Sequence, residues 1–264
     1  MKIARVELKN GEKTLAVLQK DGGLRRANGD PFAGTLAATD EIVEPVRWLT
    51  PIKPRVILCI GLNYRKHAQE SGAPIPQYPV LFMKNPNAAT GHGQPIRIPK
   101  VCGDEVDYEA ELAVVIAKTA LDVSKKDALG YVLGYTAAND VSARLWQSQL
   151  GGSQWNRGKS FNTFAPLGPV LVTPDEIPDP NALAIRSELN GREMQSSSTA
   201  DMIFDVASLI HFLSQDTTLL PGTVILTGTP EGIGWARSPK VLLKPGDTIT
   251  IEVEKIGLLS NPVA

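Results

Sequence analysis

The fold is decided by the stretch Asp107-Tyr108-Glu109-Ala110-Glu111-Leu112-Ala113-Val114-Val115-Ile116, whose β-branched end predicts a β-strand. Side chains two positions apart on a strand project from the same face, so Glu109 and Glu111 point the same way. Leu112 and Val114 point to the other face, into a core. Two like charges held side by side cost free energy unless a cation lies between them, and a divalent metal ion is the simplest such cation. The alternative is a solvated strand face whose carboxylates pair with Lys or Arg on a neighbouring strand.

The composition excludes several classes of protein. A chain of 264 residues suits one large domain, or a large domain with a small appendage. Its net charge of -1, with mixed signs and no basic stripe, argues against a nucleic-acid partner. The charged start of the chain has no signal-peptide core, and no apolar run approaches the ~18 residues of a membrane span. Cys59 and Cys102 alone make neither a disulfide framework nor a zinc site. We expect a cytoplasmic protein with no membrane partner.

The first fifty residues read as short strands joined by turns. Strands are expected at 3–8 and 14–19, on either side of the hairpin-type turn Asn10-Gly11. Pro51-Ile52-Lys53-Pro54 then has two prolines in four residues, which favours an extended linker. We therefore predict a small β-rich N-terminal domain over 1–50 and a catalytic domain over 55–264.

The catalytic domain is predicted to be mainly β, so the chain falls in the α+β class. An amphipathic helix is indicated at 203–214, where apolar residues recur at spacings of three and four. The other expected helices span 63–71, 124–129 and 140–150. Strands are expected at 56–61, 80–84, 109–117, 130–138, 168–172, 183–189, 223–227 and 248–254.

A third carboxylate strengthens the interpretation as a metal site. Asp140 follows an apolar, strand-like run from Tyr131 to Ala138 and precedes the helix expected at 140–150. At such a junction an Asp also has a purely structural role, because it can cap the helix. Together with Glu109 and Glu111, it makes an all-oxygen set that selects Mg²⁺, Mn²⁺ or Ca²⁺ over zinc.

A second constellation is the pair His67 and Glu70. Positions i and i+3 share one face of a helix, so Glu70 can orient or polarise His67. An imidazole held by a carboxylate is a good general base near neutral pH. The alternative is an ordinary polar helix surface. His92 and His211 are interpreted as structural.

A third group consists of polar side chains that could bind a substrate near the metal site. Arg144 and Gln147 would be presented together by a helix that begins after Asp140. Lys159 follows the segment 155–158, whose flexibility would let the cation approach the metal. Thr229 lies in the glycine-flanked turn 228–232, which can bring backbone N–H groups close to a ligand carboxylate. Each residue also fits a surface charge or a turn, and spacing alone does not bring them to one site.

Taken in order, these motifs resemble those of the fumarylacetoacetate hydrolase family. The pattern is most similar to the fumarylacetoacetate hydrolase domain-containing proteins and to the bacterial catabolic members of the family. The resemblance runs from about residue 55 to the C-terminus. It rests on Gly61-Leu62-Asn63-Tyr64-Arg65-Lys66-His67-Ala68-Gln69-Glu70, on Asp107 to Val115, on Gly134-Tyr135-Thr136-Ala137-Ala138-Asn139-Asp140-Val141-Ser142-Ala143-Arg144, and on Gly158-Lys159-Ser160-Phe161, Pro166-Leu167-Gly168-Pro169 and Leu226-Thr227-Gly228-Thr229-Pro230.

The resemblance implies a mixed β-roll or sandwich fold, a homodimer and a specific set of site residues. It implies that Mg²⁺ or Mn²⁺ is bound by Glu109, Glu111 and Asp140. It implies that catalysis uses Lys159 and a dyad on a mobile lid helix, His67 and Glu70. It further implies that the substrate is bound by Arg144, Gln147 and Thr229.

Three positions depart from the usual pattern of the family. Leu145 and Asn162 each stand where Asp is common, and His92 stands where Pro is frequent. The metal set and the dyad are intact, so catalysis is still expected. The departures bear on substrate preference and on the efficiency of turnover.

The resemblance implies a metal-dependent hydrolase that cleaves a C–C bond of a small 2-oxo or 2,4-dioxo acid, such as an acylpyruvate, through an enolate. In this hypothesis the metal acts as a Lewis acid and His67 deprotonates the attacking water. The same enolate would serve oxaloacetate decarboxylation, isomerisation of a hydroxymuconate-type diacid, or dehydration of a sugar acid. A homologue that binds ligands without catalysis is a further alternative.

Overall fold

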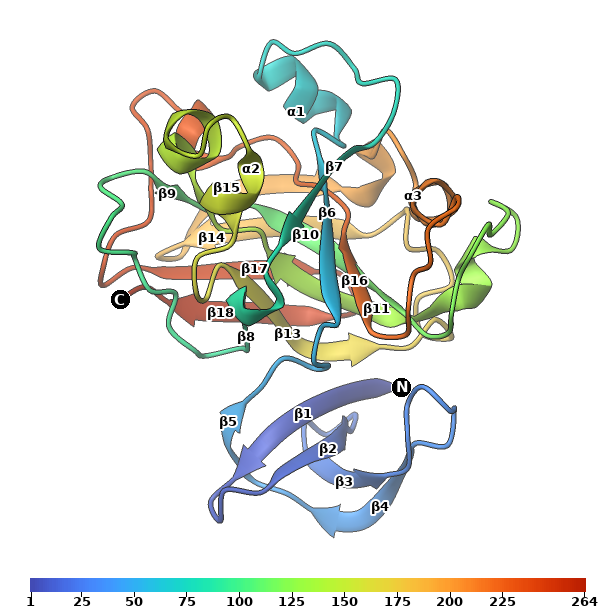
Figure 1. Ribbon diagram of the computed structural model, residues 1–264. Helices are drawn as coiled ribbons and strands as arrows, with labels where there is room; N and C mark the ends of the chain where they lie inside the picture. Colours follow the sequence, from blue (N-terminus) through green and yellow to red (C-terminus); the bar gives the residue numbers. More distant parts are fainter.

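The strand that carries Glu111 and directly follows Glu109 lies inside a large sheet. The computed structural model describes residues 1–264. Strand β10 (Ala110–Ile116) belongs to a twelve-stranded sheet in the order β4-β3-β2-β1-β13-β11-β10-β16-β6-β7, with β5 beside β1 and β8 beside β13. Every residue of β10 is buried, which explains why the sequence there is nearly continuously apolar apart from Glu111. The predicted mainly β class is confirmed (Figure 1).

The N-terminal strands extend this sheet. They lie together at the lower end of the molecule in Figure 1, and antiparallel pairing of β1 with β13 joins them to the remainder. The division into domains at 1–50 and 55–264 stays a prediction. The strands are β1 (Lys2–Leu8), β2 (Lys13–Leu18), β3 (Leu24–Asn28), β4 (Ala37–Ile42) and β5 (Pro45–Trp48).

The remaining strands of the large sheet agree with the expected positions to within a few residues, except for the two-residue strand β8, which was not predicted. They are β6 (Val56–Gly61), β7 (Val80–Lys84), β8 (Ala89–Thr90), β11 (Val132–Asn139), β13 (Ala165–Val172) and β16 (Thr223–Leu226).

A second, four-stranded sheet packs on the large one. Its order is β15-β14-β17-β18, and its strands contact β10, β11 and β13, so the two sheets form the sandwich that the resemblance implies. Alternation on β17 buries Ile249, Ile251 and Val253 between them. Two of these strands were not predicted, because β15 is mostly polar and β18 is broken by polar residues. The four are β14 (Ala184–Leu189), β15 (Arg192–Ser198), β17 (Thr248–Val253) and β18 (Gly257–Pro262).

The helices are few and short. The predicted amphipathic helix is confirmed as α3 (Val206–Leu213), and Asp205 caps it by accepting the Ser208 N–H at 2.7 Å. The helix expected at 63–71 is α1 (Arg65–Glu70), at the top of Figure 1. No helix is long and apolar enough to cross a membrane.

One expected helix is wrong, and another begins later than predicted. Residues 124–127 form a turn, and only the 3-10 helix Ala128–Tyr131 follows. The segment 140–150 begins as the extended strand β12 (Ser142–Ala143), because its backbone pairs with β9 (Val106–Asp107). Residues 144–150 are helical, and Trp146–Leu150 among them form a π-helix. Both corrections follow from pairing and packing partners far away in the sequence. The remaining 3-10 turns are Pro86–Ala88, Thr199–Asp201 and Gly234–Ala236.

Candidate active site

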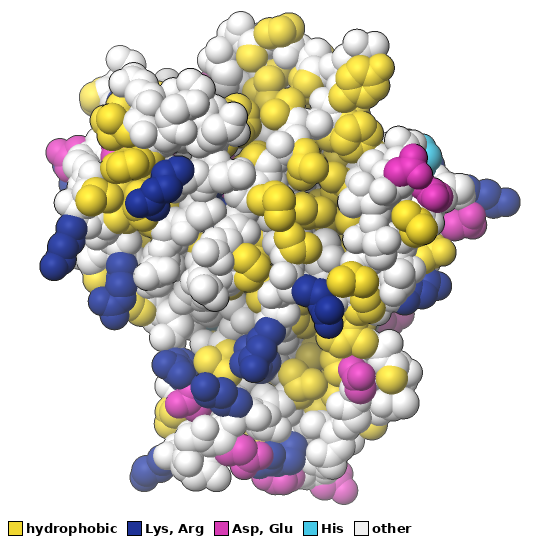
Figure 2. All heavy atoms as spheres, viewed as in Figure 1, with side chains coloured by type: hydrophobic (Ala, Val, Ile, Leu, Met, Phe, Trp, Pro, Cys, Tyr) yellow, Lys and Arg dark blue, Asp and Glu magenta, His cyan; other side chains and the backbone are white.

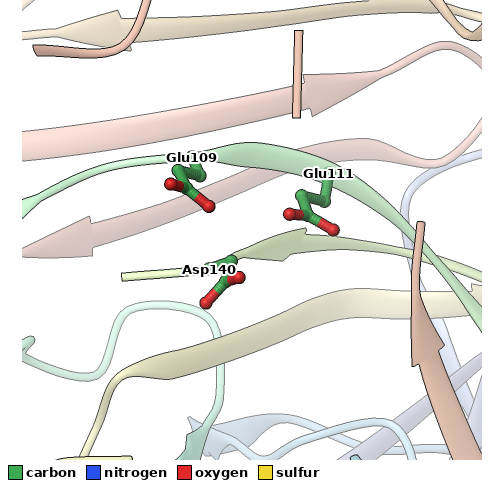
Figure 3. Close-up of side chains that lie close together, drawn as sticks. All are labelled: Glu109, Glu111 and Asp140. Carbon is green, nitrogen blue, oxygen red and sulfur yellow. The ribbon is translucent and has the colours of Figure 1, made fainter. Parts of the chain in front are cut away.

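Three carboxylates meet where β10 lies beside the end of β11. Pairing of Ala110 with Asn139 places Asp140 next to Glu109 and Glu111, and their ligand oxygens lie within 4.8 Å of one another (Figure 3). The three residues are 6%, 1% and 0% exposed. The solvated-face alternative for the glutamates is therefore wrong. So is the helix-cap alternative for Asp140, because an extended strand follows it.

Two buried lysines approach this cluster. Lys159 Nζ lies 2.7 Å from Glu109 Oε2 and 2.9 Å from Asp140 Oδ2. Lys159 ends helix α2 (Trp155–Lys159), and α2 packs on β7, which positions the amine. Lys84 donates to Asp140 Oδ1 and to the Val141 carbonyl. The sequence analysis missed Lys84, although alternation along β7 places it on the buried face with Phe82.

The two glutamates have opposite electrostatic environments. Burial alone would raise the pKa of Glu109, but Lys159 and Arg144 overcome this and lower it to about 2. Burial, Asp140 and Glu109 together raise the pKa of Glu111 well above its usual value. Glu111 has no Lys or Arg ion-pair partner, and only the Gly228 N–H donates to it, at 2.7 Å. It is the carboxylate of the cluster that most requires a cation.

Gly228 shows why the loop after β16 has a glycine. Its φ is +98°, a left-handed conformation, and an added Cβ would lie 2.7 Å from the Cβ of Asn63. Asn63 also accepts the Phe204 N–H and donates to the Thr227 carbonyl. The close approach therefore places the Gly228 N–H on Glu111 and Thr229 beside the cavity.

Arg144 is held in the site by a buried aspartate. Its Nε and Nη2 atoms donate to Asp107 Oδ2 at 3.0 and 2.8 Å, while Nη1 lies 2.6 Å from Glu109 Oε1 and 3.1 Å from Gln147 Oε1. Asp107 also accepts the N–H groups of Gly234 and Trp235. The sequence analysis missed Asp107, although it begins the stretch that decides the fold.

The dyad predicted on α1 is assembled. His67 Nδ1 lies 3.1 Å from Glu70 Oε2, and the other Glu70 oxygen accepts the Gly232 N–H at 2.8 Å. Burial opposes ionisation of Glu70, but the contacts to His67 and Gly232 outweigh it and lower its pKa. With Nδ1 held, the Nε2 atom of the buried His67 is left for the cavity that this residue lines.

One cavity of 280 Å³ joins these groups. Seven of the nine predicted site residues line it. The other two contact lining residues or their partners: Glu70 binds His67, and Asp140 belongs to the carboxylate cluster. Phe82 and Trp155 pack edge to face with ring centroids 5.4 Å apart and form part of its apolar wall. The predicted residues on the lining are His67, Glu109, Glu111, Arg144, Gln147, Lys159 and Thr229.

Comparison with known proteins agrees with this geometry. The family described as fumarylacetoacetate (FAA) hydrolase C-terminal matches residues 56–264, and the Rv2993c-like N-terminal family matches residues 1–51. The chain belongs to the fumarylacetoacetate hydrolase family. It is 49% identical over 216 residues to "Oxaloacetate tautomerase fahd2, mitochondrial" of Xenopus laevis. The aligned region covers 81% of this chain and 67% of that relative.

Solved structures of this family have the same fold. The fumarylacetoacetate hydrolase of Exiguobacterium antarcticum superposes with a TM-score of 0.87 at 33% identity, over 100% of this chain and 99% of its own. The 5-carboxymethyl-2-hydroxymuconate delta-isomerase of Mycobacterium smegmatis gives 0.86 at 37% identity, with the same coverage. These names span hydrolysis, isomerisation and tautomerisation, so membership of the fumarylacetoacetate hydrolase family indicates an enzyme without selecting one reaction.

The donor set of this fumarylacetoacetate hydrolase family member fits a divalent cation. Carboxylate oxygens are the ligands that Mg²⁺ and Mn²⁺ prefer, and Glu111 is a buried carboxylate without a cationic partner. Charge counting agrees, because the three carboxylates and Asp107 carry four negative charges, whereas Lys84, Arg144 and Lys159 carry three positive ones. A buried excess of negative charge is costly, and a bound cation relieves it.

The departures from the family pattern lie outside the cavity. Neither Leu145 nor Asn162 lines it; the Leu145 N–H donates to Glu105, and Asn162 is exposed. His92 accepts the Ser260 N–H, and His211 Nδ1 lies 2.8 Å from the Val123 carbonyl oxygen. Neither histidine lines the cavity, and their structural role stays a prediction.

Proposed function

We propose that this chain is a divalent-metal-dependent enzyme that interconverts the keto and enol forms of a small 2-oxo dicarboxylic acid of the oxaloacetate type. The observation that carries the proposal is the position of His67. It is buried, held by Glu70, and lines the same cavity as Lys159 and two of the three clustered carboxylates. The name of the Xenopus laevis relative, an oxaloacetate tautomerase, supports the choice of reaction.

Glu109, Glu111 and Asp140 would hold the metal, Mg²⁺ or Mn²⁺. When bound, such a cation supplies Lewis-acid stabilisation of negative charge on a substrate oxygen. With a divalent cation, the three carboxylates and two lysines of the cluster carry one net positive charge. That balance favours an anionic substrate.

The chain itself supplies the proton transfer. Glu70 holds Nδ1 of His67, so Nε2 can remove a proton from the carbon next to the carbonyl and return it to the carbonyl oxygen. No water is consumed and no C–C bond breaks. Arg144, Lys159 and Thr229 line the cavity beside His67 and would bind the carboxylate and oxygen groups of the acid.

The cavity favours a short substrate. Its 280 Å³ lies at the lower limit of the roughly 300–1,000 Å³ typical of small-molecule pockets. The lining combines polar groups with apolar side chains that include Phe82, Trp155 and Ile233. This mixture suits a short acid with both charged and apolar parts.

C–C bond hydrolysis of an acylpyruvate is the second candidate. The observation that favours it is again the dyad, because an imidazole held by a carboxylate also activates water. Decarboxylation of oxaloacetate and isomerisation of a hydroxymuconate-type diacid are further reactions of the same site. Only hydrolysis requires an activated water.

The first experiment is calorimetric binding of Mg²⁺ and Mn²⁺, with and without oxalate, by the wild type and by Glu109→Gln. Oxalate mimics the planar enolate of a 2-oxo acid. We expect metal-dependent oxalate binding that Glu109→Gln abolishes. Absence of metal binding by the wild type would overturn the proposal. Ultraviolet absorbance of the enol of oxaloacetate then measures tautomerisation, and acylpyruvate consumption measures hydrolysis.

We also propose a homodimer in the cytoplasm. Val80, Leu81 and Met83 on β7 are exposed, and Figure 2 shows hydrophobic side chains gathered on this face of the molecule. A second copy that covers this face would bury them in a symmetric contact. Sedimentation of the wild type and of Leu81→Asp tests the dimer.

The Xenopus laevis relative is named mitochondrial, so fractionation of the native host tests the proposed cytoplasmic location.

A further inference from the structure

A glutamine outside the cavity makes four hydrogen bonds at the site. Gln195 lies on β15 and is 1% exposed. Its Nε2 atom donates to Thr229 Oγ1 and to the Pro230 carbonyl, both at 2.9 Å. Its Oε1 atom accepts the Ala110 N–H at 2.9 Å and the Ser187 hydroxyl at 3.0 Å. The side-chain amide thus uses both of its N–H groups and both lone pairs of its oxygen.

These partners leave the amide only one orientation. The backbone N–H of Ala110 can only donate, so the atom facing it must be the oxygen of Gln195. The carbonyl of Pro230 can only accept, so the atom facing it must be the nitrogen. Rotation of the amide by half a turn would oppose donor to donor and acceptor to acceptor in a buried region, which is costly.

The orientation of Gln195 determines what Thr229 can do. The Thr229 oxygen accepts an N–H of Gln195, so its own proton must point elsewhere. The Thr229 hydroxyl donates to no protein group, and the residue lines the 280 Å³ cavity. The hydroxyl is therefore presented to a bound molecule as a donor.

We infer that Gln195 is a positioning residue that keeps the Thr229 hydroxyl a hydrogen-bond donor to a carboxylate of the bound acid. The inference rests on the proposed function for the nature of the ligand. The same amide binds Ala110, which lies between Glu109 and Glu111. It therefore also sets the distance between the carboxylate cluster and the loop that carries Thr229.

A double-mutant cycle tests the inference, with oxalate as the probe at saturating Mg²⁺. The variants are Gln195→Glu, Thr229→Val and the double variant. Gln195→Glu keeps the shape of the side chain but favours acceptance of the Thr229 proton. We expect each single variant to bind oxalate roughly tenfold to hundredfold more weakly, as for a lost hydrogen bond to a charged group. The double variant should bind no more weakly than either single one.

Ser187→Ala is the matched control. It removes a partner of Gln195 from the same buried network but leaves the bond to Thr229, so oxalate binding should stay close to that of the wild type. Gln195→Met replaces Gln195→Glu if the latter does not fold, because it also lacks the donor. Thermal unfolding and Mg²⁺ affinity are measured for every variant.

The outcomes of these binding measurements distinguish an error in the positioning role from an error in the proposed function. Multiplicative losses in the double variant, or wild-type oxalate binding by both Gln195 variants, would overturn the positioning role. Equal binding by the wild type and Thr229→Val would overturn the role of the hydroxyl. Failure of the wild type to bind oxalate with Mg²⁺ would instead overturn the proposed function, and the ligand assigned here with it.

Discussion

The amine of Lys159 lies 2.7 Å from Oε2 of Glu109, and both side chains are buried. The carboxylate holds the ammonium charge where a substrate oxygen would approach, and the ammonium lowers the pKa of Glu109 to about 2, against the opposing effect of burial. The charge that would bind the substrate and the charge that would bind the metal therefore depend on each other.

Replacement of Lys159 by Met should reduce both activity and stability. A donor to a developing oxyanion is worth about 3–4 kcal/mol, so kcat should fall roughly 10²- to 10³-fold. Loss of one partner from a buried ion network should cost about 3–5 kcal/mol of unfolding free energy. Steady-state kinetics and urea unfolding measure the two effects. Lys125→Met, which breaks the exposed pair with Asp205, should change unfolding by at most about 1 kcal/mol.

Glu111→Gln should separate metal binding from stability. The substitution keeps the shape but removes a buried charge that faces two other carboxylates. We expect the metal-free variant to be at least as stable as the wild type at neutral pH. The wild type should gain about 2.7 kcal/mol at a metal concentration 100 times Kd, and the variant should gain almost none. Thermal unfolding with and without chelator measures both. A metal-free variant much less stable than the wild type would contradict the account.

Replacement of His67 by Asn should separate decarboxylation from the two reactions that use His67 as a base. Loss of a general acid or base typically costs about 10²- to 10⁴-fold, so tautomerisation of oxaloacetate and hydrolysis of an acylpyruvate should both fall by that range. Decarboxylation needs no activated water and should fall less. Glu70→Gln should lower the same activities in a milder way, because it retains a hydrogen-bonding group at 3.1 Å from Nδ1. Equal loss of all three activities in His67→Asn would remove water activation from the scheme.

The cap of α3 should make stability depend on pH. Burial opposes ionisation of Asp205, but the Ser208 contacts and Lys125 outweigh it and lower its pKa. A carboxyl group whose pKa is lowered by folding stabilises the native state above its unfolded value of about 3.9. This contribution is lost as the pH falls through the folded pKa.

Two substitutions of Asp205 separate charge from capping. Asp205→Asn keeps a capping group, so its deficit relative to the wild type should be present at pH 7 and shrink below about pH 4. Asp205→Ala should cost about 1 kcal/mol at pH 7. Urea unfolding across this pH range measures both. A deficit of Asp205→Asn that does not change with pH would show that its charge is not involved.

Local sequence patterns predicted those elements whose residue types depend only on which face of the same strand or helix is buried. The strand with Glu109 and Glu111 and the apolar periodicity of α3 were both predicted, because alternation and helical spacing reflect which face an element buries. The helix expected at 140–150 starts only at residue 144, because pairing with Asp107 holds Ser142 extended, and that partner is distant in sequence.

The sequence by itself determined the mainly β class, the two glutamates on one side of a strand, and, through its motifs, the family. Periodicity and residue chemistry suffice for these, because both act over a few neighbouring positions. Only the tertiary structure decided that Asp140 is a buried partner of Lys84 and not a helix cap, and that Glu111 has no cation of its own. It alone showed that Asp107 holds Arg144 and that Gln195 holds Thr229. Burial and hydrogen-bond direction depend on groups that are distant in sequence and meet only in the folded chain, so no local pattern contains them.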